Sequence, residues 1–414
     1  MSDSLKVLVS AYACEPEKGS EPAAGWNWVK QTSRFNEVWV ITRANNRPAI
    51  DRSLAAQPMP NVHWVYFDLP WWLRIWKRGQ RGIRLYYYLW QSSVYFIGRR
   101  LHRKIGFHLI NHVTLGNCWM PSFLAFLPVP FIWGPVGGGE SSPKTLLETY
   151  GVKGKAYEYL RGAARYLGER DPSIRLMARR TKLTFATTSA TAERLKKLGF
   201  PGVSIFPQSG LSHEEIATLA ALPLRYGNPF RLASIGRLLH WKGFHLGLEA
   251  FARLCQEFPE SEYYLVGTGP ERRKLENLAN KLGISPHVRF WENLSRQQAM
   301  DKLVQCDALV HPSLHDSSPW ICLEAMAAGR PVICLDWGGP TLQVTHETGC
   351  KVVVVSPEQV IKDLTGAMSR LAHDPALRRA MGEAGRQRVA ECFSWDKKGE
   401  LIQEIYQEVL GRCP

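Results

Sequence analysis

The sequence of 414 residues contains no run of about 18 uninterrupted apolar residues, the length that a membrane-spanning helix needs. It has no low-complexity tract and no repeat of solenoid length, which argues against disordered and repeat architectures. The nine cysteines are odd in number and widely scattered, and they include no Cys-x-x-Cys pair. We therefore predict reduced thiols inside a folded cytoplasmic protein.

Acidic residues are missing between Asp68 and Glu140, in a chain whose formal net charge is +15. Residues 71–104 of that segment interleave aromatic rings with basic side chains: Trp71, Trp72, Arg74, Trp76, Lys77, Arg78, Arg81, Arg84, Tyr86, Tyr87, Tyr88, Trp90, Tyr95, Phe96, Arg99, Arg100, Arg103 and Lys104. Aromatic rings suit a bilayer interface, and basic side chains are attracted to anionic lipids. We predict that this segment contacts an anionic membrane surface, peripherally on the inner face of the cell membrane. The composition also fits a helix pair with its aromatic side in the core and its arginine side solvated. No nucleic-acid partner is expected, because no recognised binding motif accompanies the charge.

The sequence also lacks an Asp-x-Asp pair. Two histidine pairs have four-residue spacing, His108 with His112 and His311 with His315, but they fall on strand and loop rather than on one helix face. Because Mg²⁺ or Mn²⁺ bound to a diphosphate needs clustered carboxylates, we predict that no metal ion or other cofactor takes part.

Apolar runs of strand length alternate with helical patterns in both halves of the chain. The runs are Leu5–Ala11, Val38–Thr42, Val62–Phe67, His108–Val113, Phe131–Trp133, Leu183–Thr187 and Val203–Phe206, then Arg231–Ile235, Tyr263–Val266, Val288–Phe290, Ala308–His311, Pro331–Leu335 and Val352–Val355. Continuous apolar strands followed by helices are typical of parallel α/β sheets. The stretch Leu219–Pro229, with its prolines and glycine, separates the two series. We predict two doubly wound, Rossmann-like domains, at residues 1–222 and 229–393, that face each other across a cleft, and a closing amphipathic helix at residues 394–414.

A basic motif lies at the end of the first strand of the second series. Arg237 follows Arg231–Ile235 directly, and Lys242 comes five residues later. Arginine and lysine neutralise phosphate groups, so the two side chains can converge on one diphosphate. Taken separately, Arg237 and Lys242 are each typical of ordinary surface residues.

Two carboxylates lie eight positions apart in a later motif. Asp316 precedes a predicted helix that begins at Pro319 and ends before Gly329, and Glu324 lies inside it. A carboxylate can hold a vicinal diol through its two oxygens. The unpaired N–H groups at the helix start, near Trp320 and Ile321, favour phosphate. Two diols and one diphosphate describe a nucleotide sugar, which we predict as the ligand.

Four further residues are candidates in loops and at strand ends. Gly19 and Ser20 lie in a polar loop after the first strand, and Gly267 begins a turn that lacks the third glycine of a dinucleotide fingerprint. His112 ends the strand that starts at His108, and such a residue is also an ordinary strand-end histidine.

With these motifs, nearly the whole chain resembles the retaining glycosyltransferases of group 1, also called family four, which have the GT-B fold. The resemblance rests on Arg237, Lys242, Glu324 and the helix ending Ala327–Val332, and it is weakest at Pro70–Lys104 and Lys153–Arg180. The family usually has glutamate where this chain has Asp316, which puts the sugar contacted in doubt rather than the activity.

The resemblance implies a role for each candidate. Asp316 would contact the donor sugar, Glu324 the ribose hydroxyls, and Arg237 with Lys242 the diphosphate. Backbone groups at Gly19, Ser20, Gly267, Pro319, Trp320 and Ile321 would bind the donor, and His112 would lie near the reacting sugar.

The resemblance further implies a metal-independent, retaining hexosyltransferase that moves a sugar from a nucleotide diphosphate sugar to a glycan or lipid-linked acceptor, in bacterial-type polysaccharide or glycolipid synthesis. The N-terminal domain would take the acceptor and the C-terminal domain the nucleotide sugar. The closing helix would pack toward the N-terminal domain. Alternatives are a nucleotide-sugar epimerase of the same architecture and a non-enzymatic basic protein that binds membrane or nucleic acid.

Overall fold

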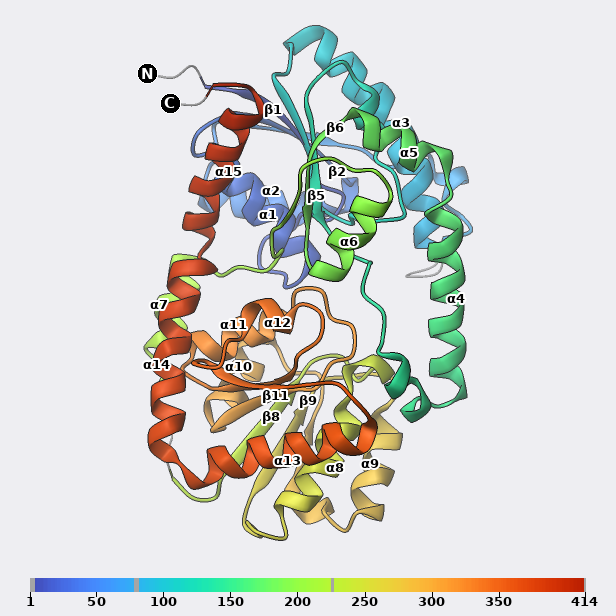
Figure 1. Cartoon of the computed structure of the whole chain (residues 1–414). Coiled ribbons are helices and arrows are strands. Elements are labelled where there is room, and N and C mark those ends of the chain that lie inside the picture. Colours follow the sequence, from blue (N-terminus) through green and yellow to red (C-terminus); the bar gives the residue numbers. More distant parts are fainter. Residues whose placement is uncertain (1–3, 78–81, 225–226, 413–414) are drawn as a thin grey trace. The chain divides into compact units, whose positions relative to one another are not determined.

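The computed structural model describes residues 4–77, 82–224 and 227–412, and it divides into two compact units (Figure 1). The first unit comprises Met1–Gly139, Gly162–Gln208 and Trp395–Pro414, and the second comprises Glu140–Arg161 and Ser209–Ser394. The sequence prediction divided the chain between residues 222 and 229. In the structure residues 140–161 and 209–222 group with the second unit.

The first unit contains seven strands and the helices around them. Its strands are β1 (Lys6–Ser10), β2 (Glu37–Thr42), β3 (Val62–Tyr66), β4 (Leu109–His112), β5 (Phe131–Val136), β6 (Thr181–Ala186) and β7 (Val203–Ile205). Its helices are α1 (Glu21–Thr32), α2 (Arg47–Ala56), α3 (Ile83–Ile105), α5 (Pro172–Arg180), α6 (Ser189–Lys197) and α15 (Trp395–Val409), with short 3-10 helices η1 (Ala44–Asn46), η2 (Trp71–Leu73) and η3 (Phe123–Phe126). The division between the units falls within α4 (Val152–Gly168).

The second unit contains six strands. They are β8 (Arg231–Ile235), β9 (Glu262–Val266), β10 (Val288–Trp291), β11 (Ala308–His311), β12 (Val332–Leu335) and β13 (Gly349–Val352). The helices are α7 (His213–Ala220), α8 (Phe244–Leu254), α9 (Arg272–Lys281), α10 (Arg296–Val304), α11 (Trp320–Ala327), α12 (Pro340–Gln343), α13 (Pro357–His373) and α14 (Pro375–Cys392), with 3-10 helices η4 (Lys144–Thr149), η5 (His240–Lys242) and η6 (Ser285–His287).

Both sheets are parallel and doubly wound. The strand order is β3-β2-β1-β4-β5-β6-β7 in the first unit and β10-β9-β8-β11-β12-β13 in the second. The order reverses between β1 and β4 and between β8 and β11, and ligands of such sheets bind beyond the carboxyl ends of the strands at these switch points. The predicted α/β class is confirmed.

One strand boundary was wrong. The last apolar run predicted a strand at Val352–Val355, whereas β13 ends at Val352 and both Val353 and Val355 are exposed. The strand instead starts at Gly349, where a Cβ atom would lie 2.1 Å from the Val332 oxygen. Close approach of two backbones therefore sets the register here, and apolar character does not reveal it.

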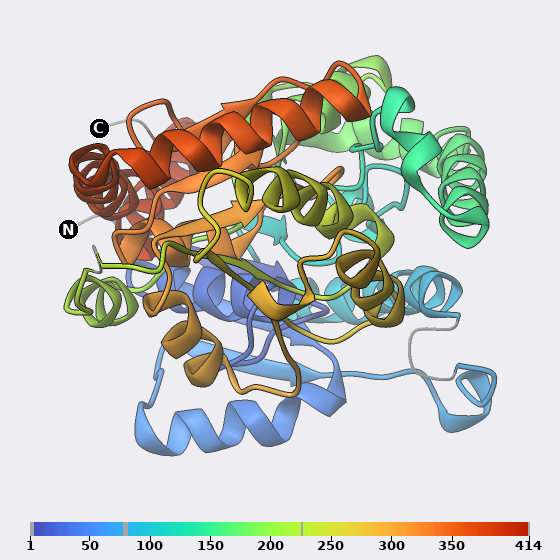
Figure 2. The same ribbon diagram turned by 90° about the horizontal axis from the view of Figure 1, so that it is seen from below.

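Helices cover the sheet of the second unit, with α13 lying along α8 (Figure 2). The helix α7 packs against α11 and α14, and its residue Leu219 belongs to the hydrophobic core of this unit. These contacts account for the grouping of residues 209–222 with the second unit.

The last helix, α15, packs against α1 of the first unit. Trp28 Nε1 donates to the Tyr406 hydroxyl at 3.2 Å, and that hydroxyl donates to Asn111 Oδ1 at 2.7 Å. All three side chains are buried, so the bonds are specific to this packing. The predicted closing helix on the N-terminal domain is confirmed.

The basic and aromatic segment at residues 71–104 divides into two parts. Tyr86, Tyr87 and Trp90 of α3 are buried in the core, as the helix-pair alternative expects. By contrast, Trp71 and Trp72 are more than half exposed. Arg78 and Arg81 lie outside the described residues. Within the described ranges, no helix combines the length and apolar character needed to cross a bilayer.

Candidate functional site

The predicted donor residues of the second unit follow the two strands at its switch point. β8 pairs with β11 through Ala308 opposite Leu232 and Leu309 opposite Ala233. The loop after β8 carries Arg237 and Lys242, and the loop after β11 carries Asp316. Because the strands are parallel, both loops leave the same edge of the sheet.

The centre of the site is an ion pair between the two loops. Lys242 Nζ lies 2.6 Å from Asp316 Oδ2, and both side chains are largely buried. His311, the last residue of β11, places Nε2 at 2.9 Å from the same oxygen. The structure therefore brings together the two predicted residues Lys242 and Asp316 with His311, which the sequence analysis had considered only as a metal ligand.

The electrostatics fix the charges in this cluster. Burial works to raise the pKa of Asp316, but the Lys242 charge and the hydrogen bond from His311 outweigh it and hold the pKa well below its ordinary value. Burial lowers the pKa of His311 despite the nearby carboxylate. Asp316 is therefore ionised and His311 neutral at pH 7, with the proton on Nε2. Lys242 retains donors for a second acceptor, because an ammonium group has three.

Glycines hold the two loops against each other. Gly243 has φ +68°, and a Cβ atom there would lie 1.9 Å from the Pro312 oxygen. A Cβ atom on Gly339 would lie 2.2 Å from the Ser317 oxygen, and the Gly339 N–H donates to the Asp316 carbonyl at 2.7 Å. Gly243 thus lets the Lys242 loop contact the Asp316 loop, whereas Gly339, in the loop after β12, lets that third loop contact the Asp316 loop.

Arg237 differs from Lys242 in its surroundings. Its side chain is exposed and makes no hydrogen bond or ion pair with any residue that the structure describes. Beside it, the turns after β8 and β9 touch, because a Cβ atom on Gly267 would lie 1.9 Å from the Gly236 oxygen. The predicted donor contact Gly267 thus lies next to the Arg237 loop, and its N–H donates to the Trp291 carbonyl at 2.8 Å.

The start of α11 lies in the same loop region. Pro319 is the N-cap and Trp320 the first helical residue, and no side chain caps the N-terminus. Trp320 donates Nε1–H to the Gly210 carbonyl at 3.0 Å. The first backbone N–H groups, at Trp320 and Ile321, are thus left uncapped by any side chain at the end of the helix that attracts anions.

Glu324 is buried in α11 and pairs with a residue that the sequence analysis missed. Arg296, the first residue of α10, donates to Glu324 Oε1 from Nε at 2.9 Å and from Nη2 at 2.7 Å. Its third nitrogen, Nη1, donates to Glu215 Oε1 at 2.6 Å. Burial raises the pKa of Glu324, and the Arg296 charge acts against that shift. Because Arg296 contacts only Oε1, the second carboxylate oxygen has no such partner.

The candidates of the first unit lie at its own switch point, where β1 pairs with β4. Gly19 and Ser20 are exposed, and Ser20 has φ +62° at the N-cap of α1. His112, at the end of β4, is fully buried. Its Nε2 lies 2.8 Å from the Tyr87 hydroxyl and its Nδ1 3.1 Å from Ser10 Oγ. Burial lowers the pKa of His112 to about 3, so the ring is neutral near pH 7. Contact with a sugar would require a neighbouring side chain to move.

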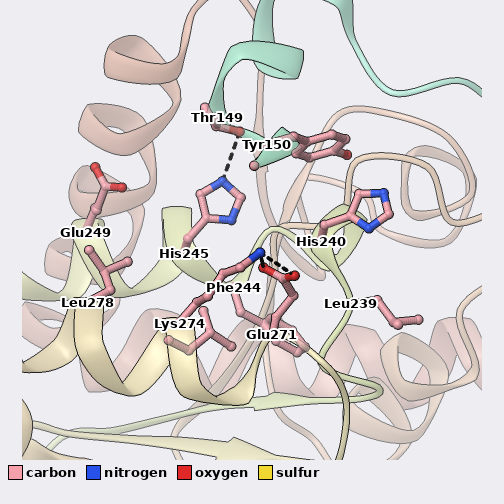
Figure 3. Close-up of a pocket in the computed structure, with 12 residues that line it drawn as sticks. Thr149, Tyr150, Leu239, His240, Phe244, His245, Glu249, Glu271, Lys274 and Leu278 are labelled. Carbon is pink, nitrogen blue, oxygen red and sulfur yellow. Dashed lines mark hydrogen bonds and ion pairs between the residues drawn. The ribbon is translucent and has the colours of Figure 1, made fainter. Parts of the chain in front are cut away.

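A pocket of about 300 Å³ lies between α8, α9 and η4 of the second unit (Figure 3). His245 Nε2 lies 3.0 Å from Thr149 Oγ1, and Lys274 pairs with Glu271 at 2.7 Å. Figure 3 shows the two members of each pair pointing toward one another. The polar groups of the pocket are thus largely paired internally. The pocket includes none of the predicted donor residues, so the switch point remains the candidate site.

Residues 4–77, 82–224 and 227–412 contain no group of three or more histidine, cysteine, aspartate or glutamate side chains arranged to hold a metal ion.

The roles of Arg296 and His311 in the site were not predicted from the sequence, for different reasons. A Ser295-x-x-Gln298 capping box marks the start of α10, and both of its hydrogen bonds are present. That pattern predicts a helix but not that its first residue reaches Glu324, 28 positions away. His311 was visible as a strand-end residue, but its pairing with Asp316 depends on the path of the intervening loop.

Known proteins resemble this chain in sequence and in fold. Residues 220–388 match the family of glycosyl transferases group 1. The chain is 33% identical over 185 residues to the lipopolysaccharide core biosynthesis glycosyltransferase LpsD of Rhizobium meliloti, covering 44% of this chain and 50% of the relative. It is 30% identical over 247 residues to LpsE of the same organism, covering 57% and 66%. A D-inositol 3-phosphate glycosyltransferase of Corynebacterium jeikeium is 31% identical over 193 residues, covering 44% and 45%. The chain thus spans about half the length of several of these curated relatives.

Solved structures share the fold over almost the whole chain. A sucrose-phosphate synthase from Thermosynechococcus elongatus has a TM-score of 0.69 at 17% identity, covering 98% of this chain and 99% of that one. WaaG, a glycosyltransferase of lipopolysaccharide biosynthesis, has a TM-score of 0.59 at 17% identity, covering 96% and 99%. HepE of Anabaena, solved with UDP and glucose, has a TM-score of 0.59 at 17% identity, covering 98% and 100%. The chain belongs to the group 1 glycosyltransferases and has the GT-B fold.

Proposed function

We propose that this protein is a retaining glycosyltransferase that moves a hexosyl group from a nucleotide diphosphate sugar to a glycan or lipid-linked acceptor. The observation that carries the proposal is the Lys242–Asp316 pair of 2.6 Å, which joins the loops after β8 and β11 beside the exposed Arg237. Such a cluster presents positive charge for a diphosphate and a fixed carboxylate for sugar hydroxyls.

Each charged residue has a distinct role in this proposal. Arg237 and Lys242 bind the diphosphate and stabilise the charge that develops as it leaves, which is why no metal ion is invoked. Asp316 accepts hydrogen bonds from the donor sugar through Oδ1, because Oδ2 already receives Lys242 and His311. Glu324 accepts from the ribose diol through the oxygen that Arg296 leaves free.

Backbone groups complete the proposed donor contacts. The N–H groups of Trp320 and Ile321, at the uncapped start of α11, can donate to a phosphate group, and Gly267 stays a predicted donor contact beside the Arg237 loop. Pro319 sets the first turn of that helix. Gly19 and Ser20 stay predicted donor contacts of the first unit.

The reaction would proceed with retention, through an oxocarbenium-like state in which the departing diphosphate carries the negative charge. The residues of the chain orient the sugar and neutralise that charge, and no enzymic nucleophile is assigned. LpsD and LpsE are lipopolysaccharide core biosynthesis glycosyltransferases, which supports a bacterial glycolipid or polysaccharide as the acceptor.

We place this reaction in the cytoplasm, at the inner face of the cell membrane. Trp71, Trp72 and Ile75 are more than half exposed, and Arg74 and Lys77 lie in the same short segment. Aromatic rings and cations together suit an anionic bilayer surface, which would bring a lipid-linked acceptor to the enzyme.

A nucleotide panel tests the donor site. We expect one of UDP, GDP, ADP or TDP and its sugar to raise the melting temperature, because a ligand that binds only the folded state stabilises it. Arg237→Ala should abolish that shift and lower turnover by about a hundredfold. Arg289→Ala, a change at another exposed arginine of the second unit, is the matched control and should leave both unchanged.

Two outcomes would contradict the proposal. Normal turnover by Arg237→Ala would remove the diphosphate role. Conversion of the donor sugar without any acceptor would instead support an epimerase.

A further inference from the structure

Helix α4 exposes its apolar side to solvent. Seven exposed residues form one side of it: Val152, Ala156, Tyr159, Leu160, Ala163, Tyr166 and Leu167. At 3.6 residues per turn these positions fall within an arc of about 120°. A surface helix of a globular protein normally directs such an arc at the core and its charges at water. Here the apolar side faces outward.

Contacts of the opposite side fix this orientation. Glu158 Oε1 lies 3.2 Å from His315 Nε2 and 3.4 Å from His240 Nε2. Burial works to raise the pKa of Glu158, but the two imidazoles outweigh it and lower the pKa to about 2. Arg161 Nη1 donates to the Glu140 carbonyl at 2.8 Å. Rotating α4 to bury its apolar arc would break these contacts.

Packing supports the same orientation. Tyr157 stacks on Trp241 with ring centroids 5.4 Å apart and an interplanar angle of 16°. Gly154 is buried, and a Cβ atom there would lie 3.1 Å from the His240 ring. Residues 152–161 of the helix thus pack within the second unit on the glycine side, and on the outward side the Arg170 guanidinium lies 3.3 Å from the centre of the Tyr166 ring.

The exposed area is too large to be incidental. Val152, Tyr159, Leu160, Tyr166 and Leu167 are each between 56% and 85% exposed. Monomeric proteins seldom leave such a contiguous apolar surface in water, and larger patches mark protein or membrane contacts.

The charges beside the arc select the partner. Lys153 and Lys155 are exposed and lie about 20° beyond its two edges. Glu158, the single acidic residue of α4, faces the protein. The outward surface is therefore apolar along its middle and positive along both edges, which complements an anionic bilayer interface. The two tyrosines suit that interface, where a ring is buried and its hydroxyl stays hydrated.

We propose that α4 lies flat on an anionic lipid surface, with its apolar arc among the acyl chains and its two lysines at the headgroups. This is a second membrane contact, separate in sequence from residues 71–104, and it rests on the proposed function only in naming a bilayer as the place of reaction. The helix has 17 residues and lies on the membrane without crossing it.

Vesicle sedimentation tests the proposal with the full chain and phosphatidylcholine vesicles that contain or lack phosphatidylglycerol. The α4 variant carries the four changes Tyr159→Ser, Leu160→Ser, Tyr166→Ser and Leu167→Ser. The matched control carries Val353→Ser and Val355→Ser, which alter exposed apolar residues of the second unit outside α4. We expect the α4 variant to bind anionic vesicles at least tenfold more weakly than the control and the unaltered protein.

The lysines provide an independent measurement. Lys153→Gln and Lys155→Gln should each weaken binding about fivefold at low salt, because a basic side chain near an anionic surface contributes that much. The control pair Lys196→Gln and Lys197→Gln on α6 should have no such effect. Salt should weaken binding of the unaltered protein and reduce the difference.

Three outcomes would overturn the proposal. Unchanged binding by the α4 variant, with loss in a Trp71→Ser/Trp72→Ser variant, would leave only the first membrane segment. A dimer of the unaltered protein that the α4 variant dissolves, with no vesicle binding, would assign the face to a second copy. An equal loss of binding in the Val353→Ser/Val355→Ser control would show that binding does not depend on the α4 face. The nucleotide-dependent rise in melting temperature is measured in parallel, and its absence would count against the donor site alone.

Discussion

His112 offers a test of whether a candidate catalytic residue is structural. It is fully buried, and its two ring nitrogens lie beside Tyr87 and Ser10. Burial lowers its pKa from the ordinary 6.5 to about 3. We consider the substitution His112→Gln, which removes the titrating ring and keeps polar atoms in its place.

The sign of the pH dependence follows from proton binding. Above pH 6.5 neither the folded nor the unfolded protein protonates this histidine, so it contributes no pH dependence. Below pH 6.5 the unfolded chain binds a proton that the folded state excludes until about pH 3. Acid therefore destabilises the fold. Between pH 7 and pH 5 the loss is about 2 kcal/mol, because it accumulates at about 1.4 kcal/mol per pH unit below 6.5.

Urea unfolding at pH 7, 6 and 5 measures this loss. The unaltered protein should lose about 2 kcal/mol more than His112→Gln over that range. The exposed His346 provides a matched control, and His346→Gln should keep the full pH dependence. Equal pH dependence in the unaltered protein and His112→Gln would refute the reasoning. A buried neutral ring also cannot serve as an acid near pH 7, so turnover by a folded His112→Gln protein should fall far less than turnover by Arg237→Ala.

Two further predictions concern the geometry of the second unit. Arg296→Met should leave Glu324 buried without its cation and raise the pKa of Glu324 further. Nucleotide affinity, measured by calorimetry, should therefore fall from pH 8 to pH 6 in the variant but not in the unaltered protein. A parallel decline in both proteins would contradict the pairing of Arg296 with Glu324. Gly243→Ala should lower the free energy of unfolding in urea by roughly 3 kcal/mol, because at φ +68° the new Cβ atom would lie 1.9 Å from the Pro312 oxygen. The control Gly283→Ala, at φ +72° with open space around it, should lower that free energy by about 1 kcal/mol. Similar losses in the two variants would show that the contact of Gly243 with Pro312 is not tight.

The sequence predicted the fold well because strands and helices leave local patterns. All thirteen strands lie at or beside the predicted apolar runs, and α11 begins one residue after the predicted Pro319. Parallel strands buried on both faces give continuous apolar runs, which are visible without any contact information. The error at β13 arose where a glycine, not an apolar run, begins the pairing.

The candidate site was predicted in part. The order of charged residues after strands was enough to name Arg237, Lys242, Asp316 and Glu324, because parallel strands bring their following loops to one edge. That reasoning could not show that Lys242 and Asp316 form a pair, since it gives the edge but not the side-chain directions. Whether His112 contacts the sugar stays a prediction.

What the sequence determined by itself is therefore the succession of elements and the charged residues at their ends, because these depend on local pattern and on the direction of parallel strands. Only the tertiary structure showed that Arg296 pairs with Glu324 and that His311 pairs with Asp316. It also showed that Glu158 lies on the inward side of α4. The amphipathic pattern of α4 would have placed its apolar arc in the core. Contacts of Glu158 with His240 and His315, which lie 82 and 157 positions further along the sequence, hold that arc on the outside.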